Sequence, residues 1–172
     1  GIRVQEVNDF LAIFVPDLEV SSGTTFNGSY NGSTNEFSMN VTSSYTRYAN
    51  ISANNFQLNQ QFQDSSLNVN YQLARFSLND TLSVKNLSFT TTGSKNLLHS
   101  DLKWNPDSPN ESNFSWNTNV QGLSSYVFDL LPSYFSINEN RWNIDKPAHI
   151  SFLPRDIHID SLMMYREDQF IS

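Results

Sequence analysis

Side chains that could do acid–base or metal chemistry are few in this sequence and widely spaced. The histidines are His99, His149 and His158. His158 and Asp160 stand two residues apart, which on a strand would place an imidazole and a carboxylate on one face, as in a metal pair. No third ligand is close in the sequence, and isoleucines alternate with both residues. We therefore interpret His158 and Asp160 as solvated side chains on the polar side of a strand.

Paired carboxylates could support glycoside hydrolysis, but their positions do not favour it. The candidates Asp101, Asp107, Asp129 and Asp168 lie mostly where turns or element surfaces are expected. The sequence has no Gly-x-Ser-x-Gly, His-Glu-x-x-His or phosphate-cradling glycine loop, and it holds only 6 glycines. We expect no catalytic residues, no metal and no cofactor, so the chain is predicted not to be an enzyme.

Tryptophans and glycosylation sequons raise the alternative of sugar recognition. Trp104, Trp116 and Trp142 could stack on pyranose rings, although Trp104 and Trp116 are in phase with apolar neighbours and are interpreted as core or groove aromatics. The N-x-S/T sequons begin at Asn27, Asn31, Asn40, Asn50, Asn79, Asn86, Asn110 and Asn113. Several arise by chance in a chain this rich in Asn, Ser and Thr. A secreted β-sandwich binding module, either carbohydrate-binding or adhesin-like, is the alternative function.

Charge and composition exclude other classes of partner. The formal net charge is −7, with 10 Lys and Arg residues and no basic run. Nucleic-acid binding is not expected, because it depends on cationic contacts to phosphate. An anionic membrane surface would also repel the chain on average. Cysteine is absent, which excludes a disulfide framework. No apolar run reaches the roughly 18–20 residues that would span a bilayer.

Apolar spacing predicts two short amphipathic helices, each ended by a proline. The first is expected in residues 4–15, before Pro16. The second is expected before Pro132, from the spacing of Leu123, Tyr126, Val127, Leu130 and Leu131.

The rest of the chain alternates with a period of two, which is typical of strands with one apolar face. Breaks are expected at Asn79-Asp80, at Thr92-Gly93-Ser94 and in residues 105–110. About eleven to thirteen strands with short connections predict an all-β protein with an antiparallel sheet. Two short helices cannot cover so many strands. The sheet must therefore fold as a sandwich, close as a barrel or curl into an open trough.

The apolar face of a trough could hold the hydrocarbon of a ligand. The candidate lining is Phe37, Met39, Val41, Phe56, Leu58, Leu67, Val69, Tyr71, Leu73, Phe76, Leu78, Leu87, Phe89, Leu102, Trp104, Phe114 and Trp116. Burying about 14 methylenes at roughly 0.8 kcal/mol each would contribute on the order of 11 kcal/mol. An acyl chain could thus be held without a cationic headgroup pocket. A one-residue slip in register would move a whole set to the other face.

The last thirty residues carry the most specific pattern. They contain, in order, Trp142-Asn-Ile144, Ile150-Ser-Phe152, Ile157-His-Ile159-Asp-Ser-Leu162 and Gln169-Phe-Ile171. A W-x-I strand, an I-x-I-x-x-L strand and a Q-x-I strand in this order resemble the recurring unit of the TamB family, within the wider AsmA-like group. The family usually has a glycine just after the last strand, where this chain has Ser172. The close match runs from Tyr134 to Ile171.

The resemblance implies a long curled antiparallel sheet, forming an open taco-like groove or a flattened sandwich. It implies a periplasmic segment of a protein anchored in the inner membrane of diderm bacteria. The implied role is a non-enzymatic scaffold and hydrophobic groove for phospholipid transport and outer-membrane assembly. Phospholipid acyl chains and a BamA-like outer-membrane protein are the implied partners.

The chain is expected to be one fragment of a larger repetitive β protein. Within residues 1–172 we expect two sub-units, 1–121 with a helix and long strands, and 122–172 with a helix and the TamB-like strand unit. An edge strand exposed by truncation could pair between copies of the fragment.

Overall fold

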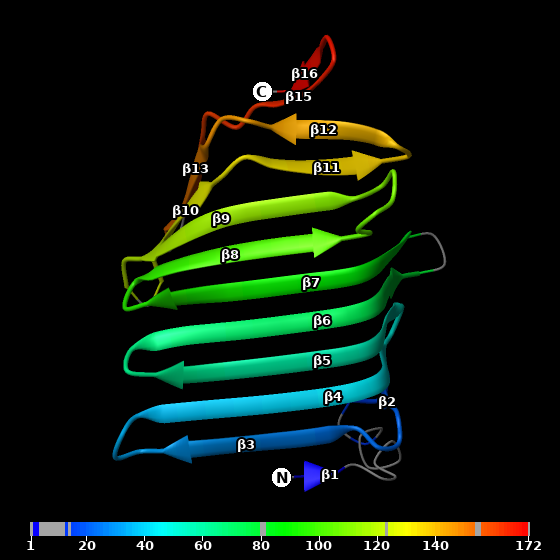
Figure 1. Ribbon diagram of the computed structural model, residues 1–172, viewed down its shortest axis with the longest axis vertical. Coiled ribbons are helices and arrows are strands. Elements are labelled where there is room, and N and C mark those ends of the chain that lie inside the picture. Colours follow the sequence, from blue (N-terminus) through cyan, green and yellow to red (C-terminus); the bar gives the residue numbers. More distant parts are fainter. Residues whose placement is uncertain are drawn as a thin grey trace. The chain divides into compact units, whose positions relative to one another are not determined.

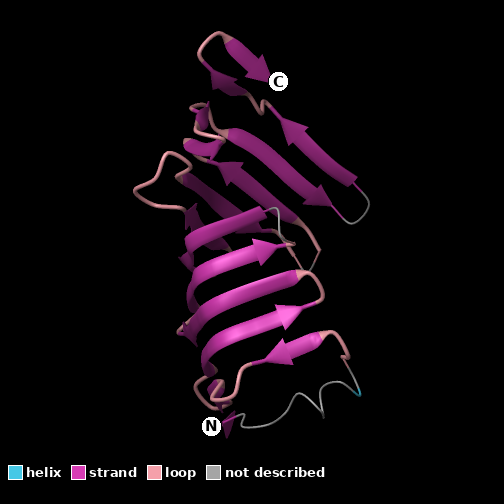
Figure 2. Ribbon diagram, turned by 90° about the vertical axis from the view of Figure 1, so that its right-hand side faces the viewer, coloured by secondary structure: helices cyan, strands magenta, loops and turns pink. Residues whose placement is uncertain are grey.

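Almost the whole described chain is β structure. The computed structural model describes residues 2–3, 13, 15–79, 82–122, 124–153 and 156–171. These residues form sixteen strands that belong to one sheet (Figures 1 and 2). All of the strand pairs with a described register are antiparallel, which confirms the predicted fold class. The hydrogen-bonded order of the described strands does not close on itself, so the barrel is excluded.

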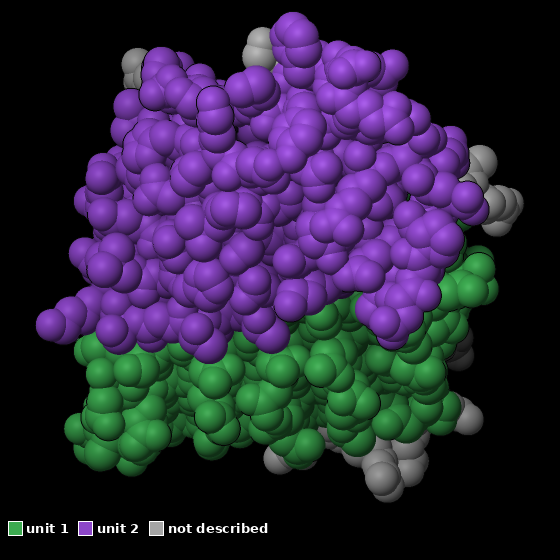
Figure 3. Space-filling view, turned by 45° about the horizontal axis from the view of Figure 1, so that its top comes forward, with its two compact units in different colours: residues 1–89 green, residues 90–172 purple. Residues whose placement is uncertain are grey.

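The chain divides into two compact units, Gly1–Phe89 and Thr90–Ser172 (Figure 3). Strand β7 (Leu82–Ser94) supplies residues to both. The expected sub-unit boundary after residue 121 falls inside the second unit, in the connection between β9 and β10.

The first unit is a meander of long strands. Its hydrogen-bonded order is β1-β3-β4-β5-β6-β7, and β2 pairs with β4 beside β3. Tight turns connect the long strands; Asp64 and Ser65 both have positive φ, at 51° and 65°, as the favoured two-residue hairpin turn requires. The bounds are β1 (Ile2–Arg3), β2 (Leu18–Val20), β3 (Thr25–Asn31), β4 (Glu36–Tyr48), β5 (Ile51–Gln63) and β6 (Ser66–Leu78).

A crease crosses the strands of the first unit, and Figure 1 shows β4 and β5 bending near one end. Within β5, Asn55 has a φ of 50°, a left-handed conformation that asparagine adopts more readily than most residues. Pairing with β4 is interrupted at Asn55 but resumes in the same register. Hydroxyl groups satisfy the polar atoms of the bend: the Tyr45 N–H donates to Ser21 Oγ at 3.2 Å. Buried Thr24 and Ser43 join their hydroxyls at 2.8 Å.

The second unit forks after β9 (Figure 1). One branch is β10-β13-β14 and the other is β11-β12-β15-β16, and both β10 and β11 pair with β9. The bounds are β8 (Leu97–Trp104), β9 (Ser112–Val120), β10 (Tyr126–Leu130), β11 (Ser133–Ile137), β12 (Asn140–Ile144), β13 (Ala148–Leu153), β14 (Asp156–Asp160), β15 (Met164–Arg166) and β16 (Gln169–Ile171).

Proline and serine produce the fork. Pro132 has no N–H to donate, so regular pairing with β9 cannot continue through it. Serine hydroxyls take over as partners: the Ser115 N–H donates to Ser133 Oγ and the Ser136 N–H donates to Ser112 Oγ, both at 3.0 Å. Ser112 and Ser133 are buried.

The predicted second helix is wrong. Tyr126–Leu130 is strand β10, paired along its whole length with β9 on one side and β13 on the other. The segment fits the helical period and also the strand period, because Tyr126, Phe128 and Leu130 alternate with other residues. Hydrogen-bonded pairing on both sides favours the strand over the helix. The predicted first helix falls almost wholly outside the described residues, which here include only Ile13 and Val15.

One expected break is also wrong. Strand β7 runs through Gly93 to Ser94, and the turn follows at Lys95, whose φ is 55°. The described residues form more strands than expected, and several of the additional ones, such as β1, β2, β15 and β16, have only two or three residues. In the part of the chain that the structure describes, no helix combines the length and apolar character that crossing a membrane would need.

Candidate functional site

The first unit carries rows of apolar side chains on one face. Residues directly opposed in antiparallel strands point to the same side of the sheet. We call the side of β4, β5 and β6 that carries Val41, Leu58 and Tyr71 the first face. The rows across these strands are Phe37–Phe62–Leu67, Met39–Gln60–Val69, Val41–Leu58–Tyr71 and Ser43–Phe56, with Leu73 two residues beyond Tyr71. Nine of the seventeen expected lining residues therefore share the first face.

Two predicted lining residues, Phe76 and Leu78, lie beyond the crease, opposed to Ala53 and Ile51. We call the side of the strands opposite the first face the second face. The alternation of side chains shifts at the crease: Thr46 Oγ1 donates to Ser43 Oγ at 3.1 Å, so these two residues point to the same side although they are three apart. Thr46 is opposed to Ala53 and Ala53 to Phe76, so the side that carries the apolar rows continues to Phe76. Leu87 and Phe89 stand two residues apart in β7, and both are half-buried.

The second unit places its predicted lining residues together. Leu102 is opposed to Phe114, and the rings of Trp104 and Phe114 stack with centroids 5.6 Å apart. Trp116 is opposed to Leu130 on β10. Because these positions on β8 and β9 are an even number of residues apart, all four expected residues share one face, the apolar face of the second unit.

Most of these apolar side chains are half-buried. Among the described side chains, the buried hydrophobic ones are Leu73, Ile144 and Ala148. A sheet that packs on a second layer would bury whole rows of such residues. On the edge strand β14, Ile157 and Ile159 are 60% and 54% exposed. Part of the apolar surface of the described strands therefore remains in contact with solvent.

An apolar hollow of about 370 Å³ lies in the second unit. Its lining comes from β14, β15, β16 and the connection between β14 and β15, and consists of Ile159, Ser161, Leu162, Met164 and Ile171. None of these residues was predicted as lining. The alternation of Ile157 and Ile159 with polar residues was the available signal, but sequence alone does not show that Ile171 returns to the same place.

Two of the three histidines each contact an aspartate carboxylate. His149 Nδ1 lies 2.7 Å from Asp129 Oδ1, and His99 Nε2 lies 3.2 Å from Asp101 Oδ2. The first contact runs between neighbouring strands and the second along one strand, and all four side chains are partly exposed. His158 and Asp160 are exposed on β14, as expected. Among the described residues, no cluster of three such side chains could hold a metal ion.

Tyr134 sits in a charged environment beside the fork. Its hydroxyl donates to Glu111 Oε1 at 2.5 Å, and Arg141 Cζ lies 3.5 Å from the ring centroid. The hydrogen bond to Glu111 raises the pKa of Tyr134 above 10.0, with smaller contributions from burial and from the Glu111 charge, while Arg141 lowers it. The folded protein therefore holds this proton more tightly than the unfolded chain. The hydrogen bond between Tyr134 and Glu111 therefore contributes its full stabilisation below pH 10.0. This stabilisation is lost as the pH rises through the pKa of Tyr134 in the folded protein.

We expect Tyr134→Phe to be less stable than the parent protein at neutral pH, because the bond to Glu111 is lost. The difference should shrink as the pH rises above 10.0, since the parent loses its advantage there. Urea unfolding across this range measures both effects. Tyr30→Phe, at an exposed position, is the control and should leave the pH dependence unchanged. A constant difference between parent and variant would contradict the assignment.

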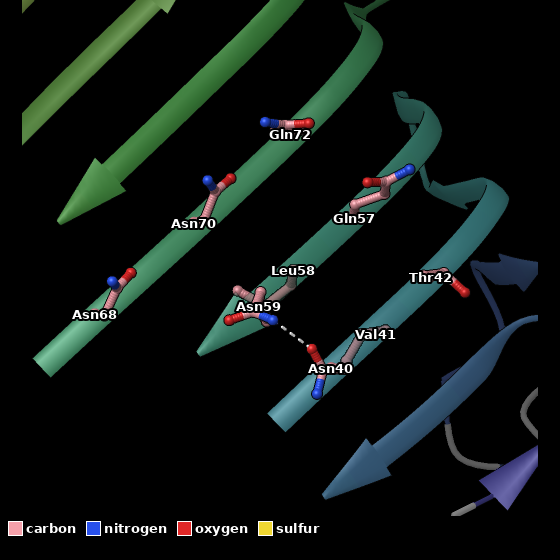
Figure 4. Close-up of a pocket in the computed structure, with 9 residues that line it drawn as sticks. All are labelled: Asn40, Val41, Thr42, Gln57, Leu58, Asn59, Asn68, Asn70 and Gln72. Carbon is pink, nitrogen blue, oxygen red and sulfur yellow. Dashed lines mark hydrogen bonds between the residues drawn. The ribbon is translucent and has the colours of Figure 1, made fainter. Parts of the chain in front are cut away.

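Amide side chains line a hollow of about 480 Å³ on the second face of the first unit (Figure 4). Asn59 Nδ2 donates to Asn40 Oδ1 at 2.6 Å. The side chains that point into view are Asn40, Thr42, Gln57, Asn59, Asn68, Asn70 and Gln72. None of the lining residues is charged. Each amide offers donors and an acceptor, which suits a neutral, hydroxyl-rich partner.

No protein-family model, curated protein or solved structure matches this chain. The fold and the candidate site define only a class of protein: an antiparallel sheet protein with rows of half-buried apolar side chains on one face.

Proposed function

We propose that this chain is a non-enzymatic periplasmic segment of a TamB-like protein. In this proposal its apolar sheet faces hold phospholipid acyl chains during transport and outer-membrane assembly. The full-length protein would be anchored in the inner membrane and act with a BamA-like outer-membrane partner. The single observation that carries the proposal is that apolar rows share a face while few apolar residues are buried. The strand order from Trp142 to Ile171 supports it through the resemblance.

The dimensions of the first face suit a hydrocarbon chain. From Phe37 to Ser43 the strand advances six residues, or about 20 Å at 3.3 Å per residue. Each methylene removed from water on such a surface contributes about 0.8 kcal/mol. A chain lying along the rows would therefore be held mainly by apolar contact, as a conduit requires.

Strand β14 offers a matched test, because its alternate residues face opposite sides. We expect the double substitution Ile157→Asn and Ile159→Asn to reduce phospholipid binding about tenfold, since apolar area is lost from the hollow side. His158→Asn, on the other side of the same strand, should bind like the parent. All of these side chains are exposed, so the fold should survive.

Binding can be read from tryptophan fluorescence. Trp104, Trp116 and Trp142 lie in the second unit, and phospholipids brominated in their acyl chains should quench them while unbrominated ones do not. Native mass spectrometry of the gently purified protein should show bound lipid. Absence of both quenching and bound lipid in the parent protein would refute the conduit proposal.

A second candidate is a carbohydrate-binding module, which the amide hollow of Figure 4 favours. It predicts binding to neutral glycans that Asn59→Ala weakens, because Asn59 lies between Asn40 and Asn70 in one row. A glycan array with no signal above background removes this candidate.

A further inference from the structure

The polar side of the first unit continues across the crease on the second face. On β4, Thr46 carries the first face onward, so its neighbour Tyr45 points to the second face. Tyr45 is opposed to Asn54, and Asn54 to Arg75. Arg75 therefore lies on the same side of β6 as Gln72, which lines the amide hollow of Figure 4. The second face thus presents uncharged amides and, further along the same strands, an arginine.

The second face is hollowed again around Arg75, with a volume of about 520 Å³. Arg75 Nε donates to Ser83 Oγ at 2.9 Å, and the Ser77 hydroxyl donates to the same oxygen at 3.3 Å. A guanidinium has five N–H donors, so this bond leaves Arg75 donors for a ligand. Ser52 and Asn79 add polar groups to the lining, and among the described residues no acidic side chain lines this hollow. We call it the Arg75 hollow.

Positive charge gathers at the Arg75 hollow. Arg47 also lines it, with its guanidinium in an ion pair with Glu19. Lys85 follows Ser83 by two residues on β7 and therefore points to the same side of the sheet. In a chain of net charge −7, cationic side chains on one part of one face favour an anionic partner there.

The two hollows together fit a ligand that is rich in hydroxyl groups and also acidic. Side-chain amides both donate to and accept from hydroxyl groups, and a guanidinium donates to the two oxygens of a carboxylate. From Asn68 to Arg75 the strand advances seven residues, about 23 Å, which accommodates several sugar rings. We infer that the second face binds an acidic polysaccharide, with sugar rings on the amide hollow and a carboxylate in the Arg75 hollow.

This inference rests on the second candidate function, glycan binding, and adds the charge of the ligand. It does not depend on the lipid proposal, because the apolar rows of the first unit lie on the opposite side of the sheet. Acidic glycans and acyl chains would therefore contact different faces of the same strands.

The test compares an oligogalacturonate with its fully methyl-esterified form, which has the same rings without the charge, by isothermal titration of the whole chain. The parent protein should bind the acidic form about fivefold more tightly, the scale of an exposed ion pair. Arg75→Gln should remove this preference and leave the affinity for the ester unchanged. Arg75→Lys should keep part of it, because the charge remains. Arg166→Gln, in β15 of the second unit, is the control and should behave like the parent.

The outcomes separate the acidic ligand from glycan binding itself. Asn59→Ala should weaken both forms by the same factor, because the amide hollow contacts the rings. If the parent binds both forms equally, or if the preference survives in Arg75→Gln, the carboxylate assignment is overturned while glycan binding stands. If the parent binds neither form, the inference falls, and the glycan array decides the candidate function separately. Free galacturonic acid should not compete at the concentration at which the oligomer saturates the protein, and strong competition would overturn the polysaccharide in favour of a small carboxylate.

Discussion

Gly93→Ala is expected to destabilise the second unit by about 1–3 kcal/mol, the usual cost of overpacking. A Cβ at Gly93 would lie 2.2 Å from the carbonyl oxygen of Leu97 and 2.7 Å from Leu98 Cα. Both are backbone atoms, so no side-chain rotation relieves the clash and β7 must separate from β8. The separation would also strain the buried hydroxyl pair of Thr91 and Ser100, joined at 2.8 Å. Urea unfolding measures the loss.

Gly28→Ala is the matched control for this prediction. The alanine Cβ there would meet the Phe26 ring and the Ser38 carbonyl oxygen at 3.5 Å, which is ordinary van der Waals contact. Glycine-to-alanine changes without strain stabilise by about 0.4–1 kcal/mol through the unfolded chain. We therefore expect Gly28→Ala to match or exceed the parent protein. Equal stability of the two glycine variants would show that the β7–β8 approach is not tight.

Local alternation was enough to predict the fold class and the strands of the TamB-like pattern. Trp142, Ile150, Ile157 and Phe170 all lie in strands, as predicted. The helix before Pro132 was mispredicted because a five-residue segment fits either period, and the residues that pair with it lie 6 to 26 residues away in sequence. Such non-local pairing is not visible in a single segment.

The candidate surface was predictable within a strand and not across the crease. From Leu67 to Leu73 the inward set follows directly from alternation. At Phe76 and Leu78 the apolar positions shift from odd to even numbers, because the strands bend between Leu73 and Phe76 and the alternation shifts with the bend. Nothing in the sequence of β6 alone shows that bend. The alternation of side chains within a strand can be read from its residues. The neighbours of a side chain on the next strand depend on the register between the two strands.

A sheet with few buried apolar side chains depends strongly on those few for its stability. In the second unit, Ile144 is one of them, and we call its surroundings beside the fork the corner. Ile144 ends β12, is opposed to Ser133 at the fork, and is only 1% exposed. Ala148, also 1% exposed, begins β13 on the other branch. One fully buried side chain thus lies on each branch close to the fork, and we expect both to hold the branches in place there.

Ile144→Ala is expected to cost about 2–5 kcal/mol, because the corner loses a buried side chain and little around it can collapse into the space. Ile137→Ala, in the adjacent β11 and 58% exposed, is the control and should change stability by no more than about 0.5 kcal/mol. Urea unfolding gives the magnitudes. Hydrogen exchange should show faster exchange in both β12 and β13 for Ile144→Ala, since one corner holds both branches. Loosening of β12 alone, or equal stability of the two isoleucine variants, would contradict this role of the corner.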